Sequence, residues 1–344
     1  MRTITFFDTK PYDKVYFDQK KESYGFEITY LEEKLNRHTA RLAEGTQAVV
    51  AFVNDTLDQE TIEQLYEVGV RVIGMRCAGY NNVDFEAAYG KIHIVRVPAY
   101  SPYAVAEYAM GVLLMLNRKL HRAYNRTREF NFSLNGLTGF DLHGKTVGVV
   151  GTGKIGRVFL TICRGFGMEV LAYDPYPVPD ADFSYTDLRT LCESSDVISL
   201  HCPLTKESYH LIDRKSIDWM KEGAVLINTS RGALIDSEEL IAALKCGKIS
   251  AAGLDVYEEE SELFYEDFSN TIVQDDVLAR LLSLPNVLIT SHQAFLTKEA
   301  LCNIADVTLG NLADYFAGRP LPNEICYHCS RNGSCRKEHK ERCF

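Results

Sequence analysis

The segment GTGKIG, residues 151–156, constrains the fold of this chain more than any other feature. It directly follows the apolar run TVGVV and precedes an amphipathic stretch that starts near Lys154. In such a turn, Gly151 permits the tight bend, Gly153 lets the backbone approach a pyrophosphate, and Gly156 allows the helix to pack closely on the strand. The pattern predicts a Rossmann-type domain whose helix N-terminus faces the phosphates of a dinucleotide.

Short β-rich runs alternate with amphipathic stretches along most of the chain. The first series of runs is ITFFD (3–7), EITYL (27–31), AVVAFV (48–53), RVIGMRC (71–77) and HIVRVP (93–98). The second series is KTVGVVG (145–151), EVLAYD (169–174), DVISLHC (196–202), AVLINTS (224–230), ISAAGLDV (249–256) and NVLITSH (286–292). Such alternation is typical of parallel α/β structure. We predict an α/β fold with two Rossmann-like domains, parallel sheets flanked by helices, and a deep interdomain cleft.

Two helical stretches indicate where the domains meet. One long connecting helix is predicted from about Pro102 to Arg128, with Pro102 in the first turn, where its missing N–H costs nothing. A second helix, from about Lys298 to Phe316, is too short to be a domain and should pack back on the first one. The predicted division is a discontinuous substrate domain (1–100 and 298–330), a dinucleotide-binding domain (101–297) and a cysteine-rich tail (331–344).

Composition excludes several classes of protein. The 344 residues carry a formal net charge of -10, whereas a protein that binds a nucleic-acid backbone normally has a basic surface. The N-terminus lacks the features of a secretory signal, and no apolar run approaches the roughly 20 residues that span a bilayer. We therefore expect a cytoplasmic protein that binds neither nucleic acid nor membranes.

Asp174 predicts the identity of the dinucleotide. It ends the strand predicted after the glycine turn, where a carboxylate would accept hydrogen bonds from the adenosine ribose. A 2′-phosphate would be repelled there, so NAD is favoured over NADP. Two alternatives stay open on these residues alone, namely a glycine-rich turn without a ligand and an aspartate that merely ends a strand.

Several longer motifs carry a resemblance to a known family. They are RCAGYNNVD (76–84), VPAYSPYAVAEYA (97–109), GVVGTGKIG (148–156), LHCPLT (200–205), NTSRGALID (228–236), GLDVYEEE (253–260) and SHQAF (291–295). With these motifs the chain resembles the D-isomer-specific 2-hydroxyacid dehydrogenases, most closely the fermentative bacterial D-lactate dehydrogenases. The resemblance implies reduction of pyruvate, a small 2-oxo acid, to D-lactate with NADH, and a homodimer or homotetramer with the helix after Pro102 as its interface.

The resemblance implies three catalytic residues. Arg231 corresponds to the substrate-binding arginine, Glu260 to the acidic partner, and His292 to the acid/base histidine. The chemistry suits these residue types, because an imidazole with an ordinary pKa of about 6.5 can donate the proton that the reduced carbonyl needs. A nearby carboxylate would raise that pKa, and the planar guanidinium can grip and polarise the substrate.

Six further residues are expected at the substrate. The backbone of Cys77, Ala78 and Gly79 can cup a carboxylate as an anion nest, a position that resembles the family's carboxylate loop. Tyr100 is placed to reach the substrate, and Phe52 and Phe295 would form an apolar floor for a methyl group. The stretch from Glu258 through Gln274 favours pyruvate, although larger 2-oxo acids remain an alternative.

The remaining implied positions contact the cofactor. They are Gly151, Gly153, Lys154, Ile155, Gly156, Asp174, His201, Cys202, Pro203, Asn228, Thr229 and Asp255. The resemblance puts His201 and Pro203 beside the adenine and Asp255 near the nicotinamide amide. The alternative for each is a strand-end residue that only packs the sheet. No histidine and carboxylate spacing repeats a metal-binding pattern, and hydride transfer needs no metal, so we predict no catalytic metal.

The C-terminal segment after residue 325 departs from the family. It carries Cys326, Cys329, Cys335 and Cys343 within its nineteen residues. Closely spaced thiols can bind zinc or form disulfides, and the alternative is a tail with reduced cysteines. A rival for the whole chain is a non-catalytic NAD-sensing protein, because some corepressors resemble this family and keep its three catalytic residues.

Overall fold

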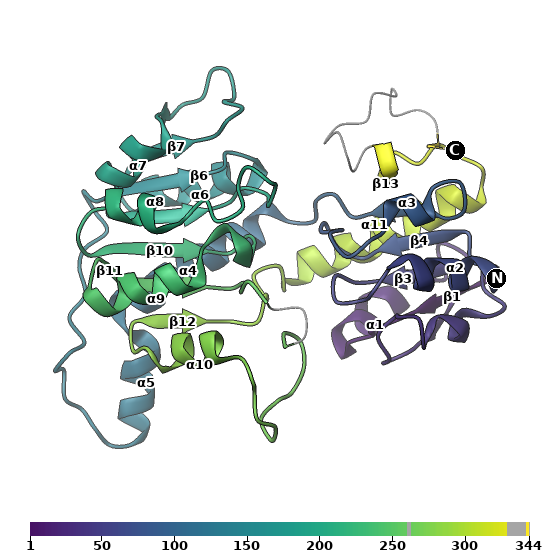
Figure 1. Ribbon diagram of the computed structural model, residues 1–344, viewed down its shortest axis with the longest axis horizontal. Helices are drawn as coiled ribbons and strands as arrows, with labels where there is room; N and C mark the ends of the chain where they lie inside the picture. Colours follow the sequence, from purple (N-terminus) through teal and green to yellow (C-terminus); the bar gives the residue numbers. More distant parts are fainter. Residues whose placement is uncertain (260–262, 329–341, 344) are drawn as a thin grey trace. The chain divides into compact units, whose positions relative to one another are not determined.

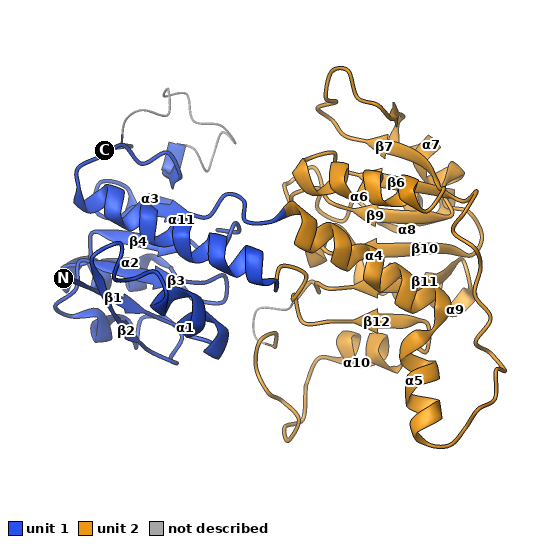
Figure 2. Cartoon of the chain, turned by 180° about the vertical axis from the view of Figure 1, so that it is seen from behind, with its two compact units in different colours: residues 1–101, 296–344 blue, residues 102–295 orange. Residues whose placement is uncertain are grey.

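The computed structural model describes residues 1–259, 263–328 and 342–343. The chain divides into two compact units (Figure 2): unit 1 is Met1–Ser101 with Leu296–Phe344, and unit 2 is Pro102–Phe295. Each unit contains one sheet whose strands are all or mostly parallel, with helices packed against it (Figure 1). The predicted α/β class with two parallel sheets is therefore confirmed.

The sheet of unit 1 has the order β13-β5-β4-β3-β1-β2. Its strands are β1 (Arg2–Phe6), β2 (Phe26–Tyr30), β3 (Ala48–Ala51), β4 (Val72–Met75), β5 (His93–Arg96) and β13 (Glu324–Ile325). Its helices are α1 (Pro11–Asp18), η1 (Ala40–Ala43), α2 (Gln59–Glu67), α3 (Phe85–Ala88) and α11 (Lys298–Phe316). Each of the five predicted strands overlaps an observed one. The two-residue β13, which pairs antiparallel with β5, was not predicted because so short a run shows no periodicity.

The helix α11 packs on unit 1 although the whole of unit 2 separates it from β4 in the sequence. Its N-cap Thr297 accepts a hydrogen bond from the backbone of Ala300 and so defines its first turn. A Cβ atom on Gly74 of β4 would lie 3.4 Å from the side chains of Thr308 and Leu312, which shows how closely the helix approaches the strand. The predicted helix at these residues is confirmed.

The sheet of unit 2 is parallel throughout, with the order β12-β11-β10-β9-β6-β7-β8. Its strands are β6 (Thr146–Val150), β7 (Glu169–Tyr173), β8 (Ser184–Tyr185), β9 (Val197–Leu200), β10 (Ala224–Asn228), β11 (Ile249–Leu254) and β12 (Val287–Ile289). Six of these strands were predicted, and β8 adds a short seventh at the edge. The order reverses beside β6, which is where an open α/β sheet binds its ligand.

Several helices of unit 2 begin at aspartate caps. They are α4 (Pro102–Arg118), α5 (Leu120–Arg128), α6 (Lys154–Gly165), α7 (Leu188–Ser194), α8 (Arg214–Trp219), η2 (Gly232–Leu234), α9 (Ser237–Cys246) and α10 (Asp276–Ser283). Aspartates cap four of them by accepting from backbone N–H groups of the first turn, namely Asp187, Asp213, Asp236 and Asp275. Such a cap satisfies a donor that the helix itself leaves unpaired.

One long helix from Pro102 to Arg128 was expected, and this prediction is wrong. Lys119 adopts a left-handed backbone with φ 49° and separates α4 from α5. Its ammonium donates to the carbonyl oxygens of Gly136 and Thr138 in the segment that returns from α5. Many residues of α4 itself are buried, whereas none of α5 is. Buried contacts therefore do not force α5 to continue along the axis of α4.

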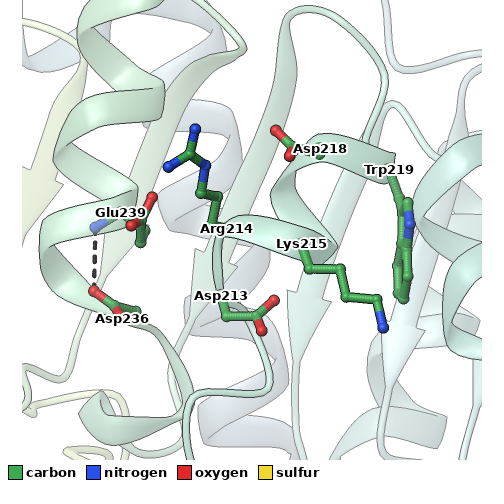
Figure 3. A pocket seen from close by; sticks show the side chains of 7 residues that line it. All are labelled: Asp213, Arg214, Lys215, Asp218, Trp219, Asp236 and Glu239. Carbon is green, nitrogen blue, oxygen red and sulfur yellow. Dashed lines mark hydrogen bonds between the residues drawn. The ribbon is translucent and has the colours of Figure 1, made fainter.

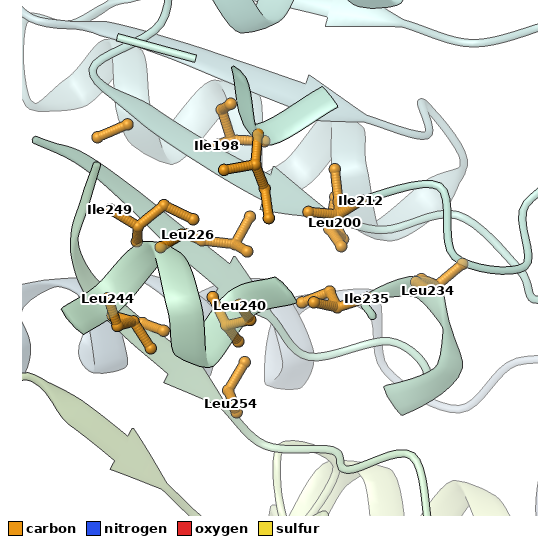
Figure 4. Close-up of a cluster of buried hydrophobic side chains, with 14 of the residues drawn as sticks. Ile198, Leu200, Ile212, Leu226, Leu234, Ile235, Leu240, Leu244, Ile249 and Leu254 are labelled. Atoms are coloured by element: carbon orange, nitrogen blue, oxygen red, sulfur yellow. The ribbon is translucent and has the colours of Figure 1, made fainter. Parts of the chain in front are cut away.

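The core of unit 2 fixes the strands that carry the candidate site. Buried side chains of β9, β10 and β11 pack against α9 and its neighbours (Figure 4), among them Ile198, Leu226, Leu240 and Leu254. On β6, a Cβ atom at Gly148 would collide with Leu191 of α7. Within the residues that the structure describes, none of the helices combines the length and the apolar character needed to cross a membrane.

Candidate active site

The predicted cofactor residues of unit 2 gather at one edge of its sheet. Because the strands are parallel, the residues that follow their carboxyl ends lie along the same edge. This edge carries Gly151 after β6, Asp174 after β7, His201 after β9, Thr229 after β10, Asp255 after β11 and His292 after β12. Arg231 follows Thr229 in the same loop. The alternation of strands in the sequence thus brings residues of six separate segments together.

The glycine turn leaves the N-terminus of α6 open. Its N-cap is Gly153, so this helix has no side-chain cap, unlike the four that aspartates cap. A Cβ atom at Gly151 would lie 2.6 Å from the backbone nitrogen of Cys202, and one at Gly156 would collide with the carbonyl oxygen of Gly151. At Gly153, by contrast, a Cβ atom would meet nothing within 4 Å. The exposed first turn, with Lys154 and Ile155, therefore fits the pyrophosphate of NAD.

Asp174 is held beside this turn by backbone donors. One carboxylate oxygen accepts from the backbone N–H and the hydroxyl of Thr152, at 2.7 and 3.0 Å. The other accepts from the backbone N–H of Tyr176 at 2.9 Å. The side chain is only partly buried, so it can still accept from a ribose hydroxyl. The position and charge of this carboxylate fit the adenosine ribose of NAD and disfavour a 2′-phosphate.

The loop after β9 presents neutral groups. The ring of His201 lies 4.9 Å from that of Phe159, and its Nε2 lies 2.9 Å from the hydroxyl of Ser199. Burial lowers the pKa of His201 to about 3 and raises the pKa of the Cys202 thiol to about 11, so neither carries charge near neutral pH. Pro203 is exposed, as a residue that touches a ligand needs to be.

The loop after β10 orients Arg231. The side-chain amide of Asn228 donates to the carbonyl oxygen of Arg231 at 2.8 Å and accepts from the backbone N–H of Ser230 at 3.0 Å. The guanidinium donates to the carbonyl oxygen of Ser230 at 2.7 Å, which leaves its other N–H groups for a ligand. The hydroxyl of Thr229 is buried and has no hydrogen-bond partner among the described residues. These groups fit a polar ligand at the sheet edge.

Asp255 supports the turn that carries His292. Its carboxylate accepts from the hydroxyl of Thr290 at 2.7 Å and from the backbone N–H groups of Gln293 and Ala294 at 2.9 and 2.8 Å. Asp255 is fully buried, and burial raises its pKa against these hydrogen bonds. Its contact with the nicotinamide amide stays a prediction. Glu260, the expected partner of the histidine, lies outside the described residues.

Unit 1 also places its predicted site residues at the carboxyl edge of its sheet. Phe52 follows β3, Cys77 follows β4, and Tyr100 lies in the segment after β5. Among the described residues, no group accepts a hydrogen bond from the backbone N–H of Ala78 or Gly79. Two free donors in one turn fit the expected carboxylate nest. Phe295 is the last residue of unit 2 and is buried.

Three polar residues beneath Phe52 were missed in the sequence. They are Asp55, Arg76 and Asn82, all bonded to the segments that carry Phe52 and Cys77. Arg76 and Asn82 stand within the RCAGYNNVD motif, and that placement was the available signal. Burial of Arg76 could not be read from the motif, because an arginine is normally exposed.

The C-terminal cysteines are described in part. Cys326 is buried directly after β13, and the backbone N–H of Cys343 donates to the carboxylate of Glu324 at 2.7 Å. Burial, Glu324 and the neighbouring Cys326 all raise the pKa of the Cys343 thiol. Cys329 and Cys335 lie outside the described residues. Within the ranges that are described, no three metal-binding side chains are grouped to hold an ion.

A surface hollow of about 420 Å³ is lined by other residues of unit 2 (Figure 3). Side chains around the starts of α8 and α9 line it, namely Asp213, Arg214, Lys215, Asp218, Trp219, Asp236 and Glu239. None of them was predicted for the site. Asp213 and Asp236 among them are engaged as helix caps.

Comparisons with known proteins agree with this geometry. Residues 110–294 match the model of the D-isomer specific 2-hydroxyacid dehydrogenase NAD binding domain. The chain is 53% identical to D-lactate dehydrogenase of Escherichia coli over 94% of its own length and 99% of that enzyme. Its model matches the apo-structure of the E. coli D-lactate dehydrogenase with a TM-score of 0.87, at 51% identity over 94% of this chain and 99% of that one.

Two further structures extend the comparison. The pyruvate reductase of Chlamydomonas reinhardtii has a TM-score of 0.89 and 43% identity, with 93% of this chain and 98% of that chain covered. An NAD-complexed D-isomer specific 2-hydroxyacid dehydrogenase of Lactobacillus delbrueckii ssp. bulgaricus has a TM-score of 0.80 and 30% identity, with 94% and 99% covered. With an open glycine turn, an aspartate held beside it and this family match, the chain belongs to the NAD-dependent D-isomer-specific 2-hydroxyacid dehydrogenases.

Proposed function

We propose that this dehydrogenase is a D-lactate dehydrogenase that reduces pyruvate with NADH. The observation that carries the proposal is the 53% identity to the E. coli D-lactate dehydrogenase across nearly the whole of both chains. Arg231 and His292 support it, because both follow carboxyl ends of the sheet that also carries the glycine turn. A carbonyl reduction needs a cation and a proton donor beside the cofactor.

The proposed reaction divides between cofactor and protein. When bound, NADH supplies a hydride to the carbonyl carbon of pyruvate. His292 donates a proton to the carbonyl oxygen as negative charge develops there, and its turn is held by Asp255. Arg231 uses the N–H groups that Ser230 leaves free to bind the substrate and polarise its carbonyl. Glu260 is proposed as the acidic partner of His292.

The substrate contacts are proposed residue by residue. The free N–H groups of Ala78 and Gly79, next to Cys77, bind the carboxylate of pyruvate. Phe52 and Phe295 form apolar walls for the methyl group. We keep Tyr100 as a further substrate contact, and its backbone is held by the amide of Asn303, which donates to its carbonyl oxygen at 2.6 Å.

A steady-state assay with four 2-oxo acids tests the proposal. Pyruvate, phenylpyruvate, hydroxypyruvate and glyoxylate are each offered with NADH and with NADPH, and the lactate formed is resolved on a chiral column. We expect the highest kcat/KM for pyruvate with NADH and D-lactate as the product. A higher value for another oxo acid would replace the substrate. Tight NADH binding without turnover of any of them would instead support a non-catalytic NAD sensor.

We also propose a homo-oligomer with the α5 region as its interface. Large apolar side chains are exposed on α5 and the segment after it, namely Leu120, Tyr124, Phe130, Phe132 and Leu134. Exposed apolar side chains this close together mark contact surfaces in proteins. A dimer or tetramer in analytical ultracentrifugation would support this proposal, and the double variant Phe130→Asp with Leu134→Asp should shift the protein toward the monomer.

We also propose a cytoplasmic location, which dependence of the reaction on NADH would support.

A further inference from the structure

A buried charged cluster lies directly beneath Phe52 in unit 1. The guanidinium carbon of Arg76 lies 3.8 Å from the centre of the Phe52 ring, and the side chain is only 2% exposed. Its Nη2 donates to the carbonyl oxygen of Asp8 at 2.7 Å, and its Nη1 lies 3.4 Å from the carboxylate of Asp13. Arg76 therefore forms one face of the space that the Phe52 ring occupies.

The backbone of Phe52 is held from two sides by further polar groups. The carboxylate of Asp55 accepts from the backbone N–H of Phe52 at 2.6 Å and from that of Leu35 at 2.7 Å. The side-chain amide of Asn82 donates to the carbonyl oxygens of Phe52 and Asp55, at 2.9 and 2.8 Å. Ring, N–H and carbonyl oxygen of Phe52 are thus each engaged by a different side chain.

The same residues belong to the segment that carries the carboxylate nest. Arg76 immediately precedes Cys77, and Asn82 ends the turn that follows Gly79. The backbone N–H of Arg76 donates to the carbonyl oxygen of Ala51 at 3.0 Å. Ala51 directly precedes Phe52 and Arg76 directly precedes Cys77, so this hydrogen bond joins the ends of β3 and β4 next to both residues. A shift of Phe52 must therefore displace the 76–82 segment or break these bonds.

The cluster is costly for mere packing. Asp8, Asp13, Asp55 and Arg76 are all nearly inaccessible to solvent, and the described part of the chain places two positive charges near the three carboxylates, Arg76 and Lys10, whose ammonium lies 2.9 Å from Asp8. Apolar side chains of the same volume would stabilise such a site as well or better. Buried polar groups of this kind instead specify one geometry at a defined position.

We infer that Asp55, Arg76 and Asn82 are positioning residues that hold Phe52 against the 77–79 nest and thereby set the size of 2-oxo acid that the enzyme accepts. The inference rests on the proposed function, because it takes Phe52 as a wall of the pyruvate site. Arg76 suits this role because a planar guanidinium can stack on a ring while its edge donates hydrogen bonds, and lysine cannot do both.

Two variants and two matched controls test the inference. Arg76→Lys keeps the buried charge but loses the flat face, and Asn82→Ala removes both hydrogen bonds to the Phe52 segment. Arg71→Lys alters another arginine, whose guanidinium carbon lies 4.1 Å from the centre of the Tyr66 ring at the opposite end of β4. Asn81→Ala alters the exposed neighbour of Asn82. Neither control residue belongs to the proposed site.

Pyruvate, 2-oxobutyrate and phenylpyruvate are compared in each variant, and the Kd of NADH is measured by fluorescence titration. One methylene is worth about 10- to 200-fold in discrimination when a pocket is tight. We expect both test variants to raise the KM for pyruvate and to lose about tenfold of the preference for pyruvate over 2-oxobutyrate. The kcat should change far less than KM, and the Kd of NADH should stay at the wild-type value, as in both controls.

The outcomes separate the inference from the proposed function. If the folded variants keep the wild-type preference for pyruvate over 2-oxobutyrate, the inference is wrong. The proposed function is unaffected by that result as long as the wild type reduces pyruvate with NADH. A wild type without NADH-dependent pyruvate reduction would overturn the function itself. Should Arg76→Lys fail to fold by circular dichroism, Asn82→Ala decides, because this residue is half-buried and carries no charge.

Discussion

The backbone N–H of His292 donates to the carbonyl oxygen of Asp255 at 2.7 Å. The carboxylate of the same aspartate accepts from the next two N–H groups, those of Gln293 and Ala294. His292 has φ 51°, a left-handed conformation that is unfavourable for a side chain larger than glycine. The aspartate therefore holds His292, the proposed acid/base residue, in a conformation that the backbone alone would not keep.

Replacing Asp255 should uncouple catalysis from cofactor binding. In Asp255→Asn the new amide would place a donor against a backbone N–H, at a cost of about 1–3 kcal/mol. We expect kcat to fall at least about tenfold with an unchanged Kd for NADH, because the histidine turn loosens while the glycine turn is untouched. Stopped-flow turnover and fluorescence titration give the two values. A weakened Kd would instead assign Asp255 to the nicotinamide, and Asp187→Asn, which alters a remote helix cap, serves as the control.

The proton donor is tested at His292 itself. His292→Gln removes the titrating group and keeps a polar side chain of similar size. We expect pyruvate reduction to fall by roughly 10²- to 10⁴-fold, the usual contribution of a general acid. NADH should still bind, since the glycine turn and Asp174 are unchanged. Near-normal turnover in this variant would rule out the histidine as the acid.

Arg231 is expected to act on both binding and chemistry. Lysine in its place keeps the positive charge but loses the planar fork, so substrate affinity and carbonyl polarisation should both weaken. Arg231→Lys should therefore raise the KM for pyruvate and lower kcat in steady-state assays. An unchanged KM would contradict bidentate binding of the substrate by this residue.

Asp55 predicts a pH dependence of stability. Burial raises the pKa of its carboxyl to about 7, with Asp8 adding to the rise and Arg76 and two backbone donors opposing it. The ordinary pKa is about 3.9, so the folded state binds the proton more tightly between these values, and the resulting stability is lost as the pH rises through about 7. The free energy of unfolding of the wild type, relative to non-titrating Asp55→Asn, should fall between pH 5 and pH 8.

Urea denaturation at four pH values in this window measures the difference. Parallel curves for the two proteins would show that Asp55 does not titrate there. Asp58→Asn is the control, because hydrogen bonds from Thr61 lower the pKa of Asp58. Its protonation is confined to more acidic solution, so the wild type and this variant should run parallel from pH 5 to pH 8.

The cysteine-rich tail should affect stability rather than turnover. The guanidinium carbon of Arg342 lies 5.0 Å from the centre of the Tyr315 ring, and the backbone N–H of Cys343 donates to the carboxylate of Glu324. These contacts attach residues 342–343 to α11 and β13. Deletion of the tail, residues 331–344, should leave kcat and KM for pyruvate unchanged and lower the Tm by a few degrees. Loss of zinc by mass spectrometry together with loss of activity would contradict this and favour a metal site.

The paired thiols make a separate test of the tail possible. Cys326 contributes to the raised pKa of Cys343, which indicates that the two thiols are neighbours, so the disulfide oxidant diamide should link them, as peptide mapping would show. Burial and Glu324 raise the pKa of Cys343, so the reaction should be slow near neutral pH, because the thiolate is the reactive form. Cys326→Ser should abolish this linkage, and Cys246→Ser, which alters an exposed cysteine, should not.

The sequence by itself determined the features that depend on neighbouring residues. The glycine turn, α11 and the strands of both sheets other than β8 and β13 were visible as local patterns, and parallel topology then required the carboxyl ends of the strands in each sheet to share an edge. Arg231 and His292, the proposed catalytic residues, were singled out through motifs that span only a few residues. Local periodicity and turn chemistry report on contacts between near neighbours, which is why these elements were predictable.

Only the tertiary structure decided the features that depend on distant contacts. The break at Lys119 follows from a segment that returns to it, β13 exists only because β5 offers it a partner, and the tail reaches Glu324 from far along the chain. The burial of Arg76 between Phe52 and Asp13 likewise joins three separate segments. Such contacts leave no periodic trace in the sequence, because their energy comes from burial and pairing across the fold.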